Sequence, residues 1–491
     1  MTAPGQVASA GLDRRNKWTF GIGTVGRDMV YTLISMYFLY FLSDVAKVPR
    51  EVFVTAGFLI LGARLFDAFA DIGMGALVDN TRSRWGQYKP WIAGGALASA
   101  LFTVLMFTDL GLTNGAFIAA VALIYLLWSL SWTANDIPYW SMLPALTIDQ
   151  KQRERYGSIA KIFATIGLFT VVVAVLPVTK ALTPSVGEYQ IVNGEVQANV
   201  ASWTWFAAGV VVIMLLGQAV TLFGVKEPRI VANQERTNLK ALAKAVFGND
   251  QLLWTALAMV LFMTGYLTTT TFGTYYFKYV YGDENMYSPF GAVLVASQLL
   301  GYGIFPAVSR RYSRHTLFTA AIGLILVGYV IFFFSDALAG YLNAAALAMT
   351  GTEVGLAHII VIGVAGLLMF IGDAFVTILM LVFLTDTIEY GHWKMNHRNG
   401  SVTFAVQPFI NKVGAALSTQ IVALLIALAA VNPDRPQDVT AEGLLTIKLG
   451  MLVIPPVLIV ISYLIYRAKY RIDADLYARI VADLKQRGEL S

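Results

Sequence analysis

The 491-residue sequence contains no cysteine and only four histidines. Without cysteine there can be no disulfide bonds, thiolate metal ligands or thiol nucleophile, although this absence does not fix the compartment. The four histidines are His315, His358, His392 and His397. Their spacing along the chain does not form the pattern of a metal site with a carboxylate ligand. The sequence therefore predicts neither thiol chemistry nor a histidine metal centre, and we expect no cofactor.

Charged residues are also scarce. They make up 13% of the chain, whereas 57% of the residues are hydrophobic and the mean hydropathy is +0.64. A soluble domain has about a quarter charged residues and about 45–50% apolar residues. The composition excludes ordinary soluble folds and predicts an integral membrane protein.

The apolar residues fall into twelve stretches, each near the length of about 20 residues that crosses the hydrocarbon core as a helix. The first is too long for the apolar core of a signal peptide, so we expect it to remain as a span. We predict an all-α membrane protein with twelve transmembrane helices. The predicted spans are 18–42, 54–77, 91–107, 116–142, 157–178, 203–224, 251–277, 290–308, 316–334, 358–384, 401–430 and 444–466.

Lysine and arginine are distributed unevenly around these spans. With the N-terminus inside, 25 of them fall in the inner segments and six on the outer side. Basic residues concentrate in the cytoplasmic loops of membrane proteins, so we predict a multi-pass protein of the plasma (inner) membrane with both termini cytoplasmic. The net charge of +5 then follows from topology, and we expect no nucleic-acid partner.

A long polar segment divides the sequence into two halves. Residues 225–250 form the longest inner loop and predict a cytoplasmic linker, with six spans before it in 1–224 and six after it in 251–466. This arrangement resembles the major facilitator architecture, in which the substrate site lies between the halves near the membrane midplane. Residues 467–491 form a tail. We expect a functional monomer embedded in the lipid bilayer.

Two segments outside the spans have informative patterns. After the fifth span, Asn193-Gly194 stands between two short alternating runs, which predicts an outer β-hairpin. In the tail, apolar residues recur every four positions from Ile472 to Leu484 among charges. This period predicts an amphipathic cytoplasmic helix that lies against the bundle or the membrane surface.

Apart from Lys448, which stands close to the outer end of the last span and is counted with the outer side, nine charged residues lie inside the predicted spans, mostly in the first half. An ionised aspartate at the bilayer centre costs about 3 kcal/mol on insertion scales, so each needs a partner or a purpose. The basic residues are Arg27, Arg64, Lys161 and Lys412, and the acidic residues are Asp28, Asp67, Asp71, Asp136 and Asp373. We expect most ion and substrate chemistry in the first half, and we interpret Asp373 as a satisfied polar residue.

Three of these charges belong to the segment 64–71, Arg-Leu-Phe-Asp-Ala-Phe-Ala-Asp. Arg64, Asp67 and Asp71 are spaced i, i+3 and i+7, which places them on one stripe of a helix. Two stacked carboxylates that face a bundle interior can seat a small cation or a proton, so the stripe predicts ion-coupled transport. Arg64 has two interpretations: a structural ion-pair partner of the acids, or a participant in coupling.

Further motifs follow along the chain. Residues 79–91 read DNTRSRWGQYKPW, residues 135–141 read NDIPYWS and residues 386–394 read DTIEYGHWK. With residues 64–71, they resemble the glycoside–pentoside–hexuronide:cation symporter family, in particular its melibiose carrier branch. The resemblance runs over nearly the whole chain. It implies a secondary active symporter that imports a galactoside, glucoside, xyloside or glucuronide with a monovalent cation by alternating access.

The resemblance assigns residues to the ion. Asp67 and Asp71 match the family's cation-binding carboxylates, and Thr133 matches a hydroxyl of the same site. Lys412 matches a lysine that reaches from the second half toward the carboxylates and contributes to coupling. The implied coupling ion is H⁺, Na⁺ or Li⁺, and Asp67 and Asp71 are metal ligands only if the ion is Na⁺ or Li⁺.

The resemblance also assigns residues to the sugar. Asp28 and Asp136 match two carboxylates that hold sugar hydroxyls, and Trp140 matches the aromatic platform beneath the sugar ring. Carboxylates suit this role because charge-assisted hydrogen bonds are the stronger kind, and an indole face covers the apolar face of a pyranose. Arg27 and Lys161 can donate to sugar oxygens or balance the acids. Arg27 has a second interpretation, as the structural partner of Asp28.

Two positions depart from the melibiose branch. Ala70 stands where that branch often has asparagine, whose amide oxygen would be a hard ligand for Na⁺. The sequence therefore favours H⁺ over Na⁺. Lys161 stands where the branch has arginine. The compact ammonium group of lysine cannot make the two parallel hydrogen bonds that the planar guanidinium of arginine makes. Both differences leave the sugar open.

Other functions are compatible with the same architecture. One alternative is the transport of a non-sugar solute or a lysolipid. Another is a sensor that binds sugar without moving it. No set of nucleophile, base and oxyanion donors stands in or beside a span, so we do not expect an enzyme.

Overall fold

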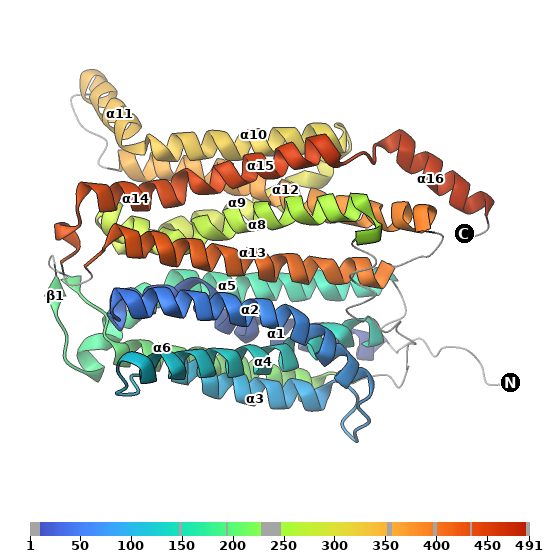
Figure 1. Cartoon of the computed structure of the whole chain (residues 1–491), viewed down its shortest axis with the longest axis horizontal. Coiled ribbons are helices and arrows are strands. Elements are labelled where there is room, and N and C mark those ends of the chain that lie inside the picture. Colours follow the sequence, from blue (N-terminus) through green and yellow to red (C-terminus); the bar gives the residue numbers. More distant parts are fainter. Residues whose placement is uncertain are drawn as a thin grey trace. The chain divides into compact units, whose positions relative to one another are not determined.

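The computed structural model describes residues 10–146, 150–192, 195–226, 247–350, 356–395, 400–432 and 435–487. These residues are helical apart from short connections and one hairpin (Figure 1). The chain divides into two compact units, Met1–Arg236 with Pro433–Arg435, and Thr237–Asn432 with Pro436–Ser491. The division at Arg236 falls within the polar loop 225–250, of which residues 227–246 lie outside the described part.

The described part of the N-terminal unit contains six long helices and the hairpin. The first helix continues into a π-helical turn, Phe41–Val45. The elements are α1 (Ala10–Tyr40), α2 (Arg50–Asp79), α3 (Lys89–Met106), α4 (Asn114–Leu146), α5 (Gln150–Val186), β1 (Ile191–Val192), β2 (Glu195–Val196) and α6 (Val200–Gly224).

The C-terminal unit has the longest helix, α12, and two short peripheral helices, α11 and α16, at opposite ends of the unit (Figure 1). A π-helical turn, Tyr276–Tyr281, follows α8, and 3₁₀ turns cover Glu284–Met286 and Pro436–Asp438. The helices are α8 (Asp250–Tyr275), α9 (Tyr287–Ser309), α10 (Arg314–Phe333), α11 (Ser335–Thr350), α12 (Ala357–Met395), α13 (Gly400–Ala429), α14 (Ala441–Leu452), α15 (Ile454–Lys469) and α16 (Ala474–Gln486).

Within the described residues, ten helical segments are long and apolar enough to cross a membrane. This finding confirms a multi-pass membrane protein. The segments do not include α1 and α2, which have 31 and 30 residues and contain the charges of the first two predicted spans. The count of twelve spans and the assignment of six to each half therefore remain predictions.

The packing around α1 is close because glycines stand where helices meet. In the N-terminal unit α1 packs against α5 and α6 (Figure 1). A Cβ on Gly26 would clash with the backbone of Met214 in α6, and one on Gly167 of α5 would clash with the carbonyl of Val25. Small residues let helix backbones approach in this way. The contacts fix the middle of α1, where the first charged residues stand.

Both segments outside the spans have the secondary structure that the sequence predicts, while the sides of the membrane on which they lie stay predictions. Strands β1 and β2 pair antiparallel with Ile191 opposite Val196. Residues 193–194, where the sequence predicts the turn, lie outside the described residues. In the tail, Asp473 caps α16 by accepting from the Leu476 amide at 2.7 Å. The apolar side of α16 is buried, and α16 packs on α12, so the tail lies against the bundle.

Candidate functional site in the N-terminal unit

Two carboxylates of α2 meet one hydroxyl of α4. Thr133 Oγ1 lies 2.6 Å from Asp67 Oδ1 and 3.0 Å from Asp71 Oδ1. Asp67 and Thr133 are 7% and 2% exposed. The predicted stripe therefore faces a neighbouring helix, and the structure brings together the three residues assigned to the ion.

The proton count of this group has a chemical consequence. A threonine hydroxyl has one hydrogen to donate, yet Thr133 is within hydrogen-bond distance of two carboxyl groups. If Thr133 donates to Asp67, its contact with Asp71 is favourable only when Asp71 carries a proton or when a cation lies among the oxygens. The geometry thus suits the binding of one positive charge.

Arg64 lies on the same helix but has a different hydrogen-bond partner. Its Nε donates to the Tyr125 hydroxyl at 2.9 Å. Its charge acts on Asp67 and on the phenol groups of Tyr31 and Tyr125. Arg64 therefore stands beside the carboxylates and is held by α4, an arrangement that leaves both of its interpretations open.

A second charged group is centred on Arg27 of α1. Its guanidinium forms an ion pair with Asp136 Oδ1 through Nη2 and donates through Nε to Asn135 Oδ1 at 2.8 Å. Arg27 is 1% exposed, and its Nη1 is buried with no hydrogen-bond partner. The structure thus gives Arg27 an ion pair with Asp136, while its charge also acts on Asp28. The interpretation of Arg27 as the structural partner of Asp28 stays a prediction.

Aromatic rings surround the same guanidinium. The Cζ atom of Arg27 lies 4.1 Å from the ring centre of Tyr139 and 5.9 Å from that of Trp140. Lys161 of α5 holds its Nζ 5.5 Å from the Trp140 ring. Cations are attracted to ring faces at such distances. Trp140, Arg27 and Lys161 therefore lie in one neighbourhood.

Asp28 completes this group. Asp28 is partly buried, and its carboxyl lies within electrostatic range of Arg27, Lys161 and Asp136. The five residues assigned to the sugar thus come from α1, α4 and α5 and are close enough to act on one ligand. Their roles as sugar-binding residues remain predictions.

Sequence reasoning missed the amides that orient Arg27. Asn135 donates through Nδ2 to the Ile92 carbonyl at 2.8 Å and to Gln218 Oε1 at 3.2 Å. Gln218 in turn donates to the Gly23 carbonyl at 3.0 Å. Both amides are buried, and buried polar groups are normally hydrogen-bonded. The sequence did offer a signal for these residues: Asn135 belongs to the motif 135–141, and Gln218 is a polar residue inside an apolar span.

Lys412 belongs to α13 of the C-terminal unit. It is half-buried. Its role toward the carboxylates of α2 therefore stays a prediction from the family resemblance.

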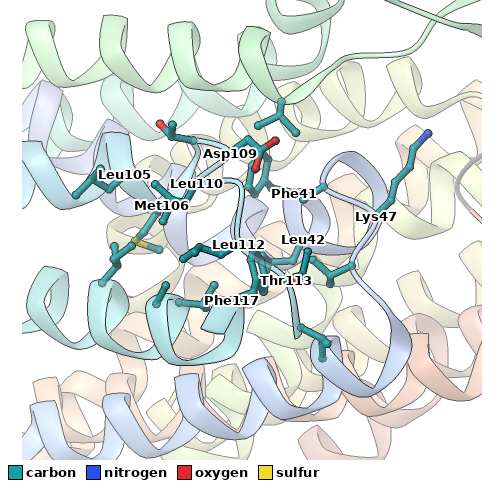
Figure 2. Close-up of a pocket in the computed structure, with 18 of the residues that line it drawn as sticks. Phe41, Leu42, Lys47, Leu105, Met106, Asp109, Leu110, Leu112, Thr113 and Phe117 are labelled. Atoms are coloured by element: carbon teal, nitrogen blue, oxygen red, sulfur yellow. The ribbon is translucent and has the colours of Figure 1, made fainter. Parts of the chain in front are cut away.

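A cavity of about 260 Å³ lies elsewhere in the N-terminal unit. It is lined mainly by apolar residues near the ends of α1 and α3 and at the start of α4, and Lys47 and Asp109 are among the lining residues (Figure 2). None of the residues assigned to ion or sugar lines it. The charged groups of α1, α2 and α4, rather than this cavity, form the candidate site.

The chain is similar to proteins that are described as sugar transporters. The profile of a family described as MFS/sugar transport protein matches residues 19–474. A lactose permease of Lactobacillus delbrueckii subsp. bulgaricus is 28% identical over 480 residues, 96% of this chain and 72% of the permease. A raffinose carrier protein of Pediococcus pentosaceus is 27% identical, covering 95% of this chain and 71% of the carrier.

The fold is also found in solved structures. A mutant of the nucleoside transporter NupG superimposes with a TM-score of 0.62 at 15% sequence identity. The match covers 93% of this chain and 100% of that structure. At this identity the likeness concerns the fold alone.

Proposed function

The chain belongs to the MFS/sugar transport protein family, and from this membership and the geometry of α2 and α4 we propose a sugar:cation symporter. It imports a sugar or glycoside together with one monovalent cation. The observation that carries the proposal is the contact of Thr133 with both Asp67 and Asp71. Thr133 lies on α4, the helix that also carries Asp136, the ion-pair partner of Arg27. The resemblance to the glycoside–pentoside–hexuronide symporters is confirmed by the family match and its permease relatives.

The ion binds, in this proposal, among three oxygens. Carboxylate and hydroxyl oxygens are the ligands that hard cations prefer, and the same carboxyls can take a proton. Asp67, Asp71 and Thr133 supply these oxygens from two helices. The bound charge neutralises one of the two acids and removes their mutual repulsion. H⁺, Na⁺ and Li⁺ are all compatible with this set.

The sugar binds next to the ion. Asp28 and Asp136 accept hydrogen bonds from sugar hydroxyls, and Trp140 covers the apolar face of the ring. The buried Nη1 of Arg27 is a donor without a partner, and leaving such a donor unsatisfied costs about 1–3 kcal/mol. A ligand oxygen beside Nη1 would recover that free energy, which makes Arg27 a substrate-binding residue in addition to the partner of Asp136.

Coupling follows from the position of both groups on α4. Residues three apart lie on the same side of a helix, so a shift of Thr133 toward a bound ion also moves Asp136. The ion thereby changes the affinity for sugar, and by linkage the sugar changes the affinity for the ion by the same factor. Alternating access then carries both across the membrane.

An acidic sugar is a second candidate substrate. Two cations, Arg27 and Lys161, stand near Trp140, and the Arg27 Nη1 is unpartnered. A guanidinium recognises a carboxylate better than it recognises a hydroxyl. A competition experiment distinguishes an acidic from a neutral substrate. A glucuronide that inhibits sugar uptake more strongly than the matching glucoside favours the acidic substrate.

The test is uptake into proteoliposomes that contain the purified protein. A panel of galactosides, glucosides, xylosides and glucuronides is offered under H⁺, Na⁺ or Li⁺ gradients. We expect at least one sugar to accumulate above its external concentration with one of these ions. Sugar binding without uptake would identify a sensor. Transport of a lysolipid or another solute that no sugar inhibits would identify the other alternative.

A further inference from the structure

A second buried carboxyl lies in the middle of the C-terminal unit. Asp373 of α12 accepts through Oδ2 from Gln298 Nε2 of α9 at 2.8 Å. The same Nε2 lies 3.0 Å from the hydroxyl of Tyr266 in α8. Asp373 is the seventeenth of the 39 residues of α12, Ala357–Met395, so it stands near the middle of a membrane-spanning helix. The family resemblance gave this residue no role.

One oxygen of this carboxyl is unsatisfied. Asp373 is 4% exposed, and its Oδ1 is buried with no hydrogen-bond partner. The interpretation of Asp373 as a satisfied polar residue is therefore wrong for this atom. The two hydrogens of the Gln298 amide are directed to Oδ2 and to Tyr266, which leaves Oδ1 as the oxygen free to carry a hydrogen.

No positive charge balances Asp373 among the described residues. They form no ion pair with it, and the titratable groups that face it are phenols: Tyr266 from α8, Tyr302 from α9 and Tyr329 from α10. Tyrosine is neutral below about pH 10. An ionised aspartate in the membrane without a counter-charge costs about 3 kcal/mol or more. A proton removes that cost without any movement of the helices.

We propose that Asp373 is a proton-binding site of the C-terminal unit. Its carboxyl carries a proton on Oδ1 in this conformation and exchanges that proton with water during the transport cycle. The loading of the site stands independently of the function proposed above, whereas the exchange during transport rests on it. The protein then has two places that can hold a positive charge: the Asp67–Asp71–Thr133 group and Asp373.

A proton is favoured over a metal cation here. The nearest side chains offer one carboxyl group, one amide that is already donating, and phenols. Na⁺ and Ca²⁺ need several oxygen ligands arranged around one point. Within the described residues there is no group of three or more acidic, histidine or cysteine side chains that could hold a metal ion. A single carboxyl with one unsatisfied oxygen is enough for a proton.

The site can be tested by infrared spectroscopy on the full-length protein in nanodiscs. A protonated carboxyl absorbs at a higher frequency than a carboxylate, and its band moves to lower frequency when the proton exchanges in D₂O. Because the Asp67–Asp71 group can carry a proton of its own, the band of Asp373 is read from the difference between wild type and Asp373→Asn. We expect this difference to contain a protonated-carboxyl band near neutral pH. The control is Asp336→Asn, which removes an acid whose side chain is 64% exposed and paired with Lys448; it should keep the band.

A second variant preserves Asp373 and so does not depend on the folding of Asp373→Asn. Gln298→Lys places an ammonium beside Oδ2, and we expect it to ionise Asp373 and abolish the same band. Protonated-carboxyl absorption of equal intensity in the wild type, Asp373→Asn and Gln298→Lys, or no such absorption in the wild type, would overturn the proton site.

Exchange is tested separately. Transported sugar should speed the shift of the band in D₂O. A band that never exchanges, with or without a transported sugar, would show a locked structural proton and refute the second half of the proposal. If the protein transports no sugar at all, the loss of the band in the two variants still tests the site.

Discussion

Thr133 and Asp136 stand three residues apart on α4, and each contacts a different neighbouring helix. Thr133 meets Asp67 and Asp71 of α2, whereas Asp136 pairs with Arg27 of α1. One turn of one helix therefore belongs to both the candidate ion site and the candidate sugar site. The predictions below separate these two contributions.

Removing either carboxylate of α2 should uncouple transport. We expect Asp67→Asn and Asp71→Asn to insert normally but to lose accumulation of sugar against a gradient. A potential of 100 mV acting on one charge supplies about 2.3 kcal/mol, equivalent to about a fifty-fold gradient. The measurement is the accumulation ratio in vesicles, which should fall to one. Undiminished accumulation in either variant, with Asp336→Asn as control, would contradict the assignment.

The hydroxyl between the carboxylates can be removed with little change of shape. Thr133→Val should weaken ion binding about ten- to a hundred-fold, because a hydrogen bond to a charged group contributes about 1.5–3 kcal/mol. Thr133→Ser keeps the hydroxyl and should bind the ion nearly as well as the wild type. The ion concentration that half-activates uptake reports the difference. Equal weakening by both variants would instead indicate packing.

The effects of replacing Arg27 and Asp136 on the stability of the protein should depend on each other. Arg27→Gln leaves an uncompensated acid and should cost about 3 kcal/mol, whereas the double variant with Asp136→Asn should recover part of that cost. Thermal unfolding in detergent measures the four proteins of this cycle. Lys394→Gln is the matched control. Both side chains of the ion pair between Lys394 and Asp250 are exposed to solvent, and such exposed pairs contribute at most about 1 kcal/mol to stability. Strictly additive effects would contradict an energetic pair.

The choice of coupling ion should depend on Ala70. With a small apolar side chain there, we expect uptake of sugar to make the medium more alkaline in the absence of sodium. Ala70→Asn adds an amide oxygen beside Asp71 and should raise the dependence on Na⁺. External pH and sodium-stimulated uptake are the two measurements. A strict sodium requirement in the wild type would refute the preference for H⁺.

Local spacing accounts for what the sequence predicted well. The i, i+4 step from Asp67 to Asp71 places both carboxylates on one stripe wherever the helix lies, and the resemblance implied Thr133 as their neighbour. Contacts between helices could not be derived in this way. Asp136 was expected to bind sugar, but nothing in the local pattern shows that it pairs with Arg27 from 109 residues away.

The same limit explains the error at Asp373. Its partner, Gln298, is 75 residues distant, and a single amide in an apolar span carries no signal for the partner that it will meet. Whether a buried acid is satisfied depends on both of its oxygens. That Oδ1 has no hydrogen-bond partner could therefore be found only from the folded structure.

The glycines at the helix contacts of α1 also constrain how this protein can change over evolution. Gly26 and Gly167 face backbone atoms of other helices. The contact of α3 with α4 is equally close, because a Cβ on Gly95 would lie 2.5 Å from the backbone nitrogen of Asn135. Even alanine at these positions would push apart the helices that hold Arg27 and Asp136. Variants with a new cargo should therefore arise by exchanging side chains that face the ligand, while the helix framework around them is inherited unchanged.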